Sequence, residues 1–119
     1  MRLHHVQVSC PLGGEDGARR FYGELLGLPE VAKPPALAAR GGCWFRGPKV
    51  EVHVGVEEPF RPARKAHPAF VVRREQLDAL ADRLADAGYP VDWDDDLPGS
   101  RRFHTADGSG NRVELLAGP

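Results

Sequence analysis

Four side chains in this sequence have the types and spacing of a divalent-metal site. They are His5, His67, Glu51 and Glu114. Each histidine lies in a short β-rich run, and each glutamate lies within a later one. Imidazole and carboxylate ligands together bind borderline or hard divalent metals, including Zn, Ni, Co, Mn and Fe(II). The sequence therefore predicts a centre of two histidines with one or two carboxylates.

Strand alternation places these side chains on polar faces. In the run 3–9 the valines share one face and His5 lies on the other, because successive strand residues point to opposite sides. Glu114 lies between two apolar residues, so its carboxylate points away from the face that they bury. His104 occupies another predicted strand, where it is as compatible with an exposed position as with a functional one.

Length and composition predict one compact domain that needs no structural metal. The chain has 119 residues, a net charge of −1 and 28% charged residues, which gives no basic field for nucleic acid. No apolar run reaches the roughly 18 residues of a membrane span. Two cysteines without a CxxC motif favour reduced thiols, with a Cys10–Cys43 disulfide as the open alternative. We therefore expect a cytoplasmic protein.

The order of predicted elements occurs twice along the chain. The first half predicts a strand at 3–9, a helix at 15–26, an edge strand or irregular loop at 31–40, and a hairpin of 42–46 with 50–54. The second half predicts a strand at 67–72, a helix at 75–87, and strands at 91–93, 101–105 and 112–116. This is an α+β protein of two βαβββ modules, at 1–56 and 66–119, with a linker at 57–65.

The repeat also aligns the candidate ligands. His5 corresponds to His67, and Glu51 to Glu114. Two modules related by an approximate two-fold axis would form a curved mixed sheet around one cavity, where all four side chains converge. His53 lies two residues after Glu51 on the same strand face and is the competing fourth ligand.

The sequence resembles the vicinal oxygen chelate superfamily over its whole length. This superfamily includes glyoxalase I, fosfomycin- and bleomycin-resistance proteins, methylmalonyl-CoA epimerase and extradiol dioxygenases. The resemblance is carried by His-Val-x-Val at His5, the helix end Phe21-Tyr22-x-x-Leu25-Leu26-Gly27-Leu28, the His67 run, and Asp107-x-x-Gly110-Asn111-Arg112-x-Glu114-Leu115. It implies a glyoxalase-like fold and metal ligands at His5, His67 and Glu114, while glyoxalase I adds a glutamate that matches Glu51.

The resemblance implies metal-dependent lyase, isomerase or dioxygenase chemistry on a small oxygen-chelating substrate. Glu51 or Glu114 would carry the proton in the reaction. Arginines at 64, 101 and 102 and Lys65 could draw an anionic substrate to the cavity rim, although most arginines are solvated surface. The alternative is a non-catalytic binding protein of the bleomycin-resistance type, with walls supplied by Trp44, Phe60 and Trp93. The resemblance also favours a homodimer.

Overall fold

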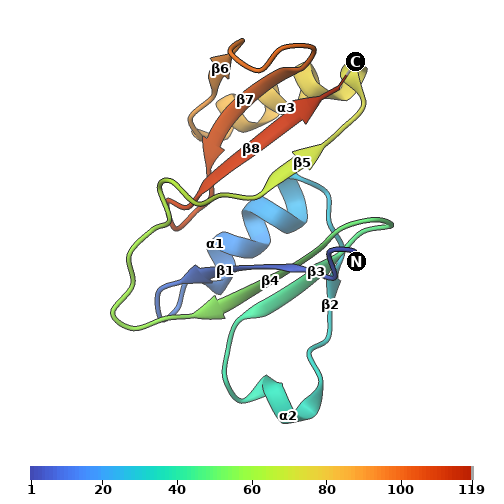
Figure 1. Cartoon of the computed structure of the whole chain (residues 1–119). Coiled ribbons are helices and arrows are strands. Elements are labelled where there is room, and N and C mark those ends of the chain that lie inside the picture. Colours follow the sequence, from blue (N-terminus) through green and yellow to red (C-terminus); the bar gives the residue numbers. More distant parts are fainter. Residues whose placement is uncertain (119) are drawn as a thin grey trace. The chain divides into compact units, whose positions relative to one another are not determined.

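The computed structural model describes residues 1–118 and divides into two compact units, Met1–Pro62 and Ala63–Pro119 (Figure 1). Each unit combines a four-stranded mixed sheet with a helical segment. The predicted α+β class is therefore confirmed. Within residues 1–118, every helix is too short or too polar to cross a membrane.

Unit 1 follows the predicted order of elements. They are β1 (Val6–Cys10), α1 (Glu15–Ala18), η1 (Arg19–Leu25), β2 (Glu30–Val31), α2 (Pro35–Ala38), β3 (Cys43–Arg46) and β4 (Glu51–Val56). The sheet order is β1-β4-β3-β2, in which β1 runs parallel to β4 and the other pairs are antiparallel. The last strand of the unit thus lies beside the first.

Unit 2 repeats this topology. Its elements are β5 (Ala69–Val71), α3 (Arg74–Asp86), β6 (Asp92–Asp94), β7 (Arg101–Ala106) and β8 (Arg112–Ala117). The sheet order is β5-β8-β7-β6, again with a parallel first pair. The internal repeat of two βαβββ units is therefore confirmed, and α2 is an addition to the first unit.

Apolar side chains cover one face of each sheet. Phe21 and Tyr22 of η1 are fully buried in unit 1, as is Phe45 of β3, and Leu77 of α3 is buried in unit 2 with Phe103 of β7. Burying such a side chain contributes about 1.5–3 kcal/mol. The helix-covered face is the core, which leaves the opposite face of each sheet for polar chemistry.

The helical segments of both units end at a glycine with positive φ. Gly27 follows η1 with φ 78°, and Gly88 follows α3 with φ 89°. The next residue donates a backbone hydrogen bond back into the helix, from Leu28 N to Tyr22 O and from Tyr89 N to Leu84 O. Glycine favours this left-handed ending because it lacks a Cβ atom.

Three predicted details differ in the structure. His5 and His67 lie just before β1 and β5 rather than within them. The segment 31–40 starts with the last residue of the edge strand Glu30–Val31 and then contains the short helix α2, which begins at Pro35 because proline is tolerated in a first turn. The predicted helix at 15–26 is α-helical for one turn and then π-helical.

Cys10 and Cys43 are both buried. Burial raises the pKa of Cys43 to about 11, so this thiol stays protonated at neutral pH.

Candidate metal centre

His67, His104 and Glu114 converge on the polar face of unit 2. The Nε2 atom of His67 lies 3.0 Å from Oε2 of Glu114, and Nε2 of His104 lies 3.7 Å from the same oxygen. One ligand atom from each residue falls within 4.8 Å of the other two. Two imidazoles and one carboxylate at this spacing fit a borderline divalent metal.

Strand register brings these three residues together. His104 of β7 is directly opposite Glu114 of β8, so their side chains share one face. His67 precedes β5, which is the other neighbour of β8, and the N–H of Glu114 donates to the carbonyl of Pro68 at 3.0 Å. The hairpin and the parallel strand therefore approach Glu114 from both sides.

The ring of His67 is oriented by a backbone contact. Its Nδ1 lies 2.8 Å from the carbonyl oxygen of Lys65, which can only accept a hydrogen bond. The Nδ1–H therefore donates to Lys65, and Nε2 faces Glu114. A hydrogen bond from the second ring nitrogen to a carbonyl is the usual support of a metal-binding histidine.

Arg102 fixes one oxygen of Glu114 and leaves the other to the histidines. Its guanidinium donates to Oε1 of Glu114 and to Oδ2 of Asp94, at 3.0 Å each. Burial would raise the pKa of Glu114, but its contacts with His67 and Arg102 outweigh burial and lower the pKa. Glu114 is thus an ionised carboxylate that is only 5% exposed.

His104 is the site residue that sequence reasoning undervalued. It is buried, and burial followed by the charge of Arg112 lowers its pKa, which favours the neutral imidazole that binds metals. The sequence did contain a signal for it. Pairing the runs 101–105 and 112–116 around the turn between them places His104 opposite Glu114.

The remaining predicted residues form a second cluster in unit 1. The ring of His53 is stacked between Trp44 and His5, with centroid distances of 3.8 and 3.9 Å. Its Nε2 lies 2.7 Å from Oε2 of Glu51, whose Oε1 accepts a hydrogen bond from Arg46 at 2.5 Å. His53 therefore joins His5 to Glu51.

Both oxygens of Glu51 have hydrogen-bond partners in this cluster. The contacts with Arg46 and then His53 lower the pKa of Glu51 to about 2, which keeps the carboxylate ionised at neutral pH. Burial lowers the pKa of His53 and favours its neutral form. The four predicted ligands thus belong to two clusters: His67 and Glu114 lie in unit 2, and His5 and Glu51 lie in unit 1.

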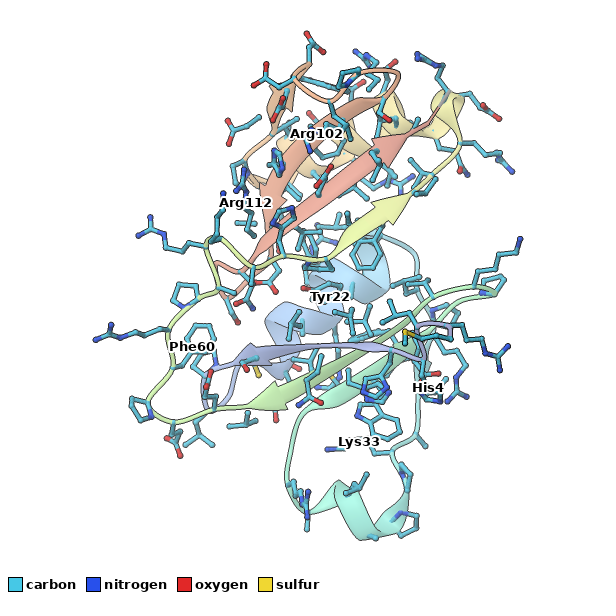
Figure 2. The ribbon with its side chains drawn as sticks, in the orientation of Figure 1. His4, Tyr22, Lys33, Phe60, Arg102 and Arg112 are labelled. Atoms are coloured by element: carbon cyan, nitrogen blue, oxygen red, sulfur yellow. The ribbon has the colours of Figure 1, made fainter. Side chains whose placement is uncertain are left out.

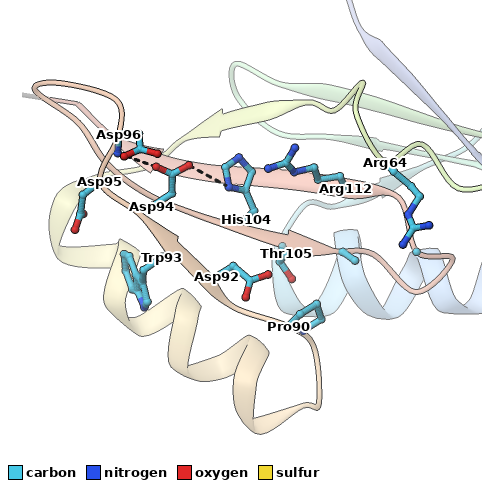
Figure 3. Close-up of a pocket in the computed structure, with 12 residues that line it drawn as sticks. Arg64, Pro90, Asp92, Trp93, Asp94, Asp95, Asp96, His104, Thr105 and Arg112 are labelled. Atoms are coloured by element: carbon cyan, nitrogen blue, oxygen red, sulfur yellow. Dashed lines mark hydrogen bonds and ion pairs between the residues drawn. The ribbon is translucent and has the colours of Figure 1, made fainter.

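A cavity of about 710 Å³ lies beside His104 in unit 2 (Figure 3). Trp93 and four aspartates of β6 and the following loop line it, together with Thr105, Arg64 and Arg112. Arg102 and Arg112 both extend from the hairpin of β7 and β8 (Figure 2). The strand predicted at 91–93 is the edge strand β6, and its Asp94 is ion-paired with Arg102.

The comparisons with known proteins identify the family. Residues 2–115 match the family model of the Glyoxalase/Bleomycin resistance protein/Dioxygenase superfamily. A Bacillus anthracis protein assigned to the glyoxalase family is 43% identical, with a TM-score of 0.93 over 100% of this chain and 96% of that one. None of the curated proteins matches the sequence.

Two more distant structures share the fold. The fosfomycin resistance protein FosX of Listeria monocytogenes is 16% identical, with a TM-score of 0.81 over 100% of this chain and 94% of that one. A lactoylglutathione lyase from Agrobacterium tumefaciens is 19% identical, with a TM-score of 0.75 over 99% and 95%. The resemblance inferred from the sequence is therefore confirmed, and the chain belongs to the Glyoxalase/Bleomycin resistance protein/Dioxygenase superfamily.

Proposed function

We propose that the protein is a divalent-metal-dependent enzyme of the lyase or isomerase type that acts on a small oxygen-chelating substrate. The observation that carries this proposal is the convergence of His67, His104 and Glu114 on one face of unit 2. Family membership supports the reaction class, and the Listeria FosX protein, 17% identical, has been solved with Mn(II).

The residues of unit 2 have distinct tasks in this proposal. His67 and Glu114 hold the metal through Nε2 and Oε2, while Lys65 and Arg102 orient them through the contacts described above. His104 is the third ligand available in the same unit, and His5 is the alternative from unit 1. A metal held there acts as a Lewis acid that polarises substrate oxygens.

Glu51 is the proposed proton carrier, with Glu114 as the other carboxylate in the site. A carboxyl group must be ionised before it accepts a proton. The hydrogen bonds with Arg46 and His53 keep the carboxyl group of Glu51 ionised. Those same bonds occupy both oxygens. Each oxygen of Glu51 still has a second lone pair, which is available to a substrate proton or to a metal as the fourth ligand.

Calorimetric titration of metal-free protein with Mn(II) and Zn(II) tests this assignment. We expect one site per chain, and we expect His67→Ala and Glu114→Ala to reduce binding strongly while the fold persists, because the ligands lie away from the core. Comparing His104→Ala with His5→Ala identifies the third ligand. Glu24→Ala is the control for the carboxylate, since Glu24 is an exposed residue of η1 that is paired with Arg20, outside both clusters. Unchanged stoichiometry in Glu114→Ala contradicts the proposal.

A non-catalytic binding protein is the second candidate, and Trp93 is the observation that favours it. The indole lines the cavity and is 41% exposed, which suits stacking on an aromatic ligand. Arg101 already lies 3.9 Å above this ring. This candidate predicts no heat on metal titration of the wild type, which separates it from the enzyme.

A further inference from the structure

We propose that the cavity beside His104 binds a small zwitterion, with a carboxylate or phosphoryl group at one end and a protonated amine at the other. This inference rests on the proposed function, because it names the substrate class of the same site. Its argument starts from the sheet register, which sets the positions of the charged groups around the cavity.

Strand β7 forms the floor between two walls of opposite charge. Asp92 of β6 pairs with His104, while Arg112 of β8 pairs with Ala106, one row further along the same face. Two strand spacings of about 4.8 Å and one two-residue step of about 6.7 Å place the Cα atoms of Asp92 and Arg112 about 12 Å apart. The short side chain of Ala106 leaves room between these walls.

The anionic end belongs at Arg112. Arg101 and Arg102, which also extend from this hairpin, are engaged with Asp78 and with the pair Glu114 and Asp94, respectively. Among residues 1–118, Arg112 forms no ion pair, although it lines the cavity. A guanidinium offers a planar fork of donors that fits a carboxylate or phosphoryl group.

The cationic end belongs at Asp92. Four aspartates line this side, and among the residues that the structure describes only Asp94 is paired with an arginine, Arg102. Within the described chain, Asp92 has no ion-pair partner. A purely anionic ligand would approach several uncompensated carboxylates, whereas a purely cationic one would leave Arg112 unused. A zwitterion satisfies both walls.

NMR titration of the metal-free protein tests the proposal. The probes are 5-aminopentanoate, pentanoate and pentylamine, monitored through the ring signals of His104 and the amide of Thr105. We expect 5-aminopentanoate to bind at least about ten-fold tighter than either singly charged probe, because its second charged end adds one charge-assisted contact. Arg112→Gln and Asp92→Asn should each remove this advantage.

Charge-matched controls are Arg61→Gln and Asp86→Asn, which lie outside the cavity lining and should keep the preference. Equal binding of the three probes, binding of none, or an equal loss in the controls overturns the proposal.

Metal titration of the same variants separates this inference from the proposed function. If Arg112→Gln and Asp92→Asn bind metal normally but the wild type shows no zwitterion preference, only this inference fails. If the wild type binds no metal, the proposed function fails.

Discussion

Glu114 is the side chain on which the candidate centre depends. One oxygen accepts from Arg102 at 3.0 Å, and the other faces His67 and His104. This division is useful for metal binding because it leaves one oxygen directed at both imidazoles. A partner that orients a ligand in this way typically changes metal affinity by 10- to 100-fold when it is removed.

Arg102→Gln should therefore weaken metal binding by about 10- to 100-fold, since Glu114 loses the contact that fixes its carboxylate. Calorimetric titration with Zn(II) measures the change. The neighbouring Arg101→Gln removes the same charge from the same strand but disturbs an exposed pair with Asp78 and a contact with Trp93, neither of which touches Glu114, so it should leave the affinity unchanged. An equal loss of metal affinity in the two variants would mean that the removed positive charge, and not the orientation of Glu114, determines the affinity.

At the scale of elements, the sequence predicted the repeat well because hydrophobic periodicity and glycine stops are local signals. The helical segments before Gly27 and Gly88 both end where the sequence predicted. Strand ends were less predictable. His5 and His67 satisfy the alternation pattern, but the backbone pairing that defines a strand begins only after them, and pairing depends on the neighbouring strand.

The candidate site was predictable only in part, for a related reason. Alternation identifies which face a residue occupies, and it placed Glu114 correctly on the polar side of β8. It does not reveal which residue lies opposite. His104 became significant through its register with Glu114, and the stacking of His53 between Trp44 and His5 required the positions of three separate segments.

Gly88→Ala should destabilise the protein by about 1 kcal/mol, because φ at this position is 89° and a Cβ atom strains the left-handed conformation. The space around Gly88 is open, with nothing within 4 Å of an added Cβ, so strain alone is measured. Denaturant unfolding gives the difference. Gly118→Ala is the control, since that site is equally open without a positive φ. An equal effect at both positions would contradict the role of Gly88 as a helix stop.

At the scale of the whole molecule, each unit leaves its first strand at a sheet edge. β1 lies at one edge of the sheet of unit 1, and β5 at one edge of the sheet of unit 2. Large apolar side chains are exposed beside them, including Leu12 after β1 at 71% and Val71 in β5 at 75%. Unpaired edges with apolar neighbours favour association. We propose that units pair between two chains, so that each metal site takes His5 from one chain and His67 with Glu114 from the other.

Mixing subunits tests this exchange. Refolded mixtures of His5→Ala and Glu114→Ala chains should contain heterodimers in which one site carries both lesions and the other has every wild-type ligand, so roughly half of the heterodimer sites regain metal. The control mixture combines His67→Ala with Glu114→Ala. Both of those lesions affect unit 2, so every heterodimer site lacks one ligand and none recovers. Failure of the first mixture to recover binding in verified heterodimers rejects the exchanged site, as does full metal binding by His5→Ala alone.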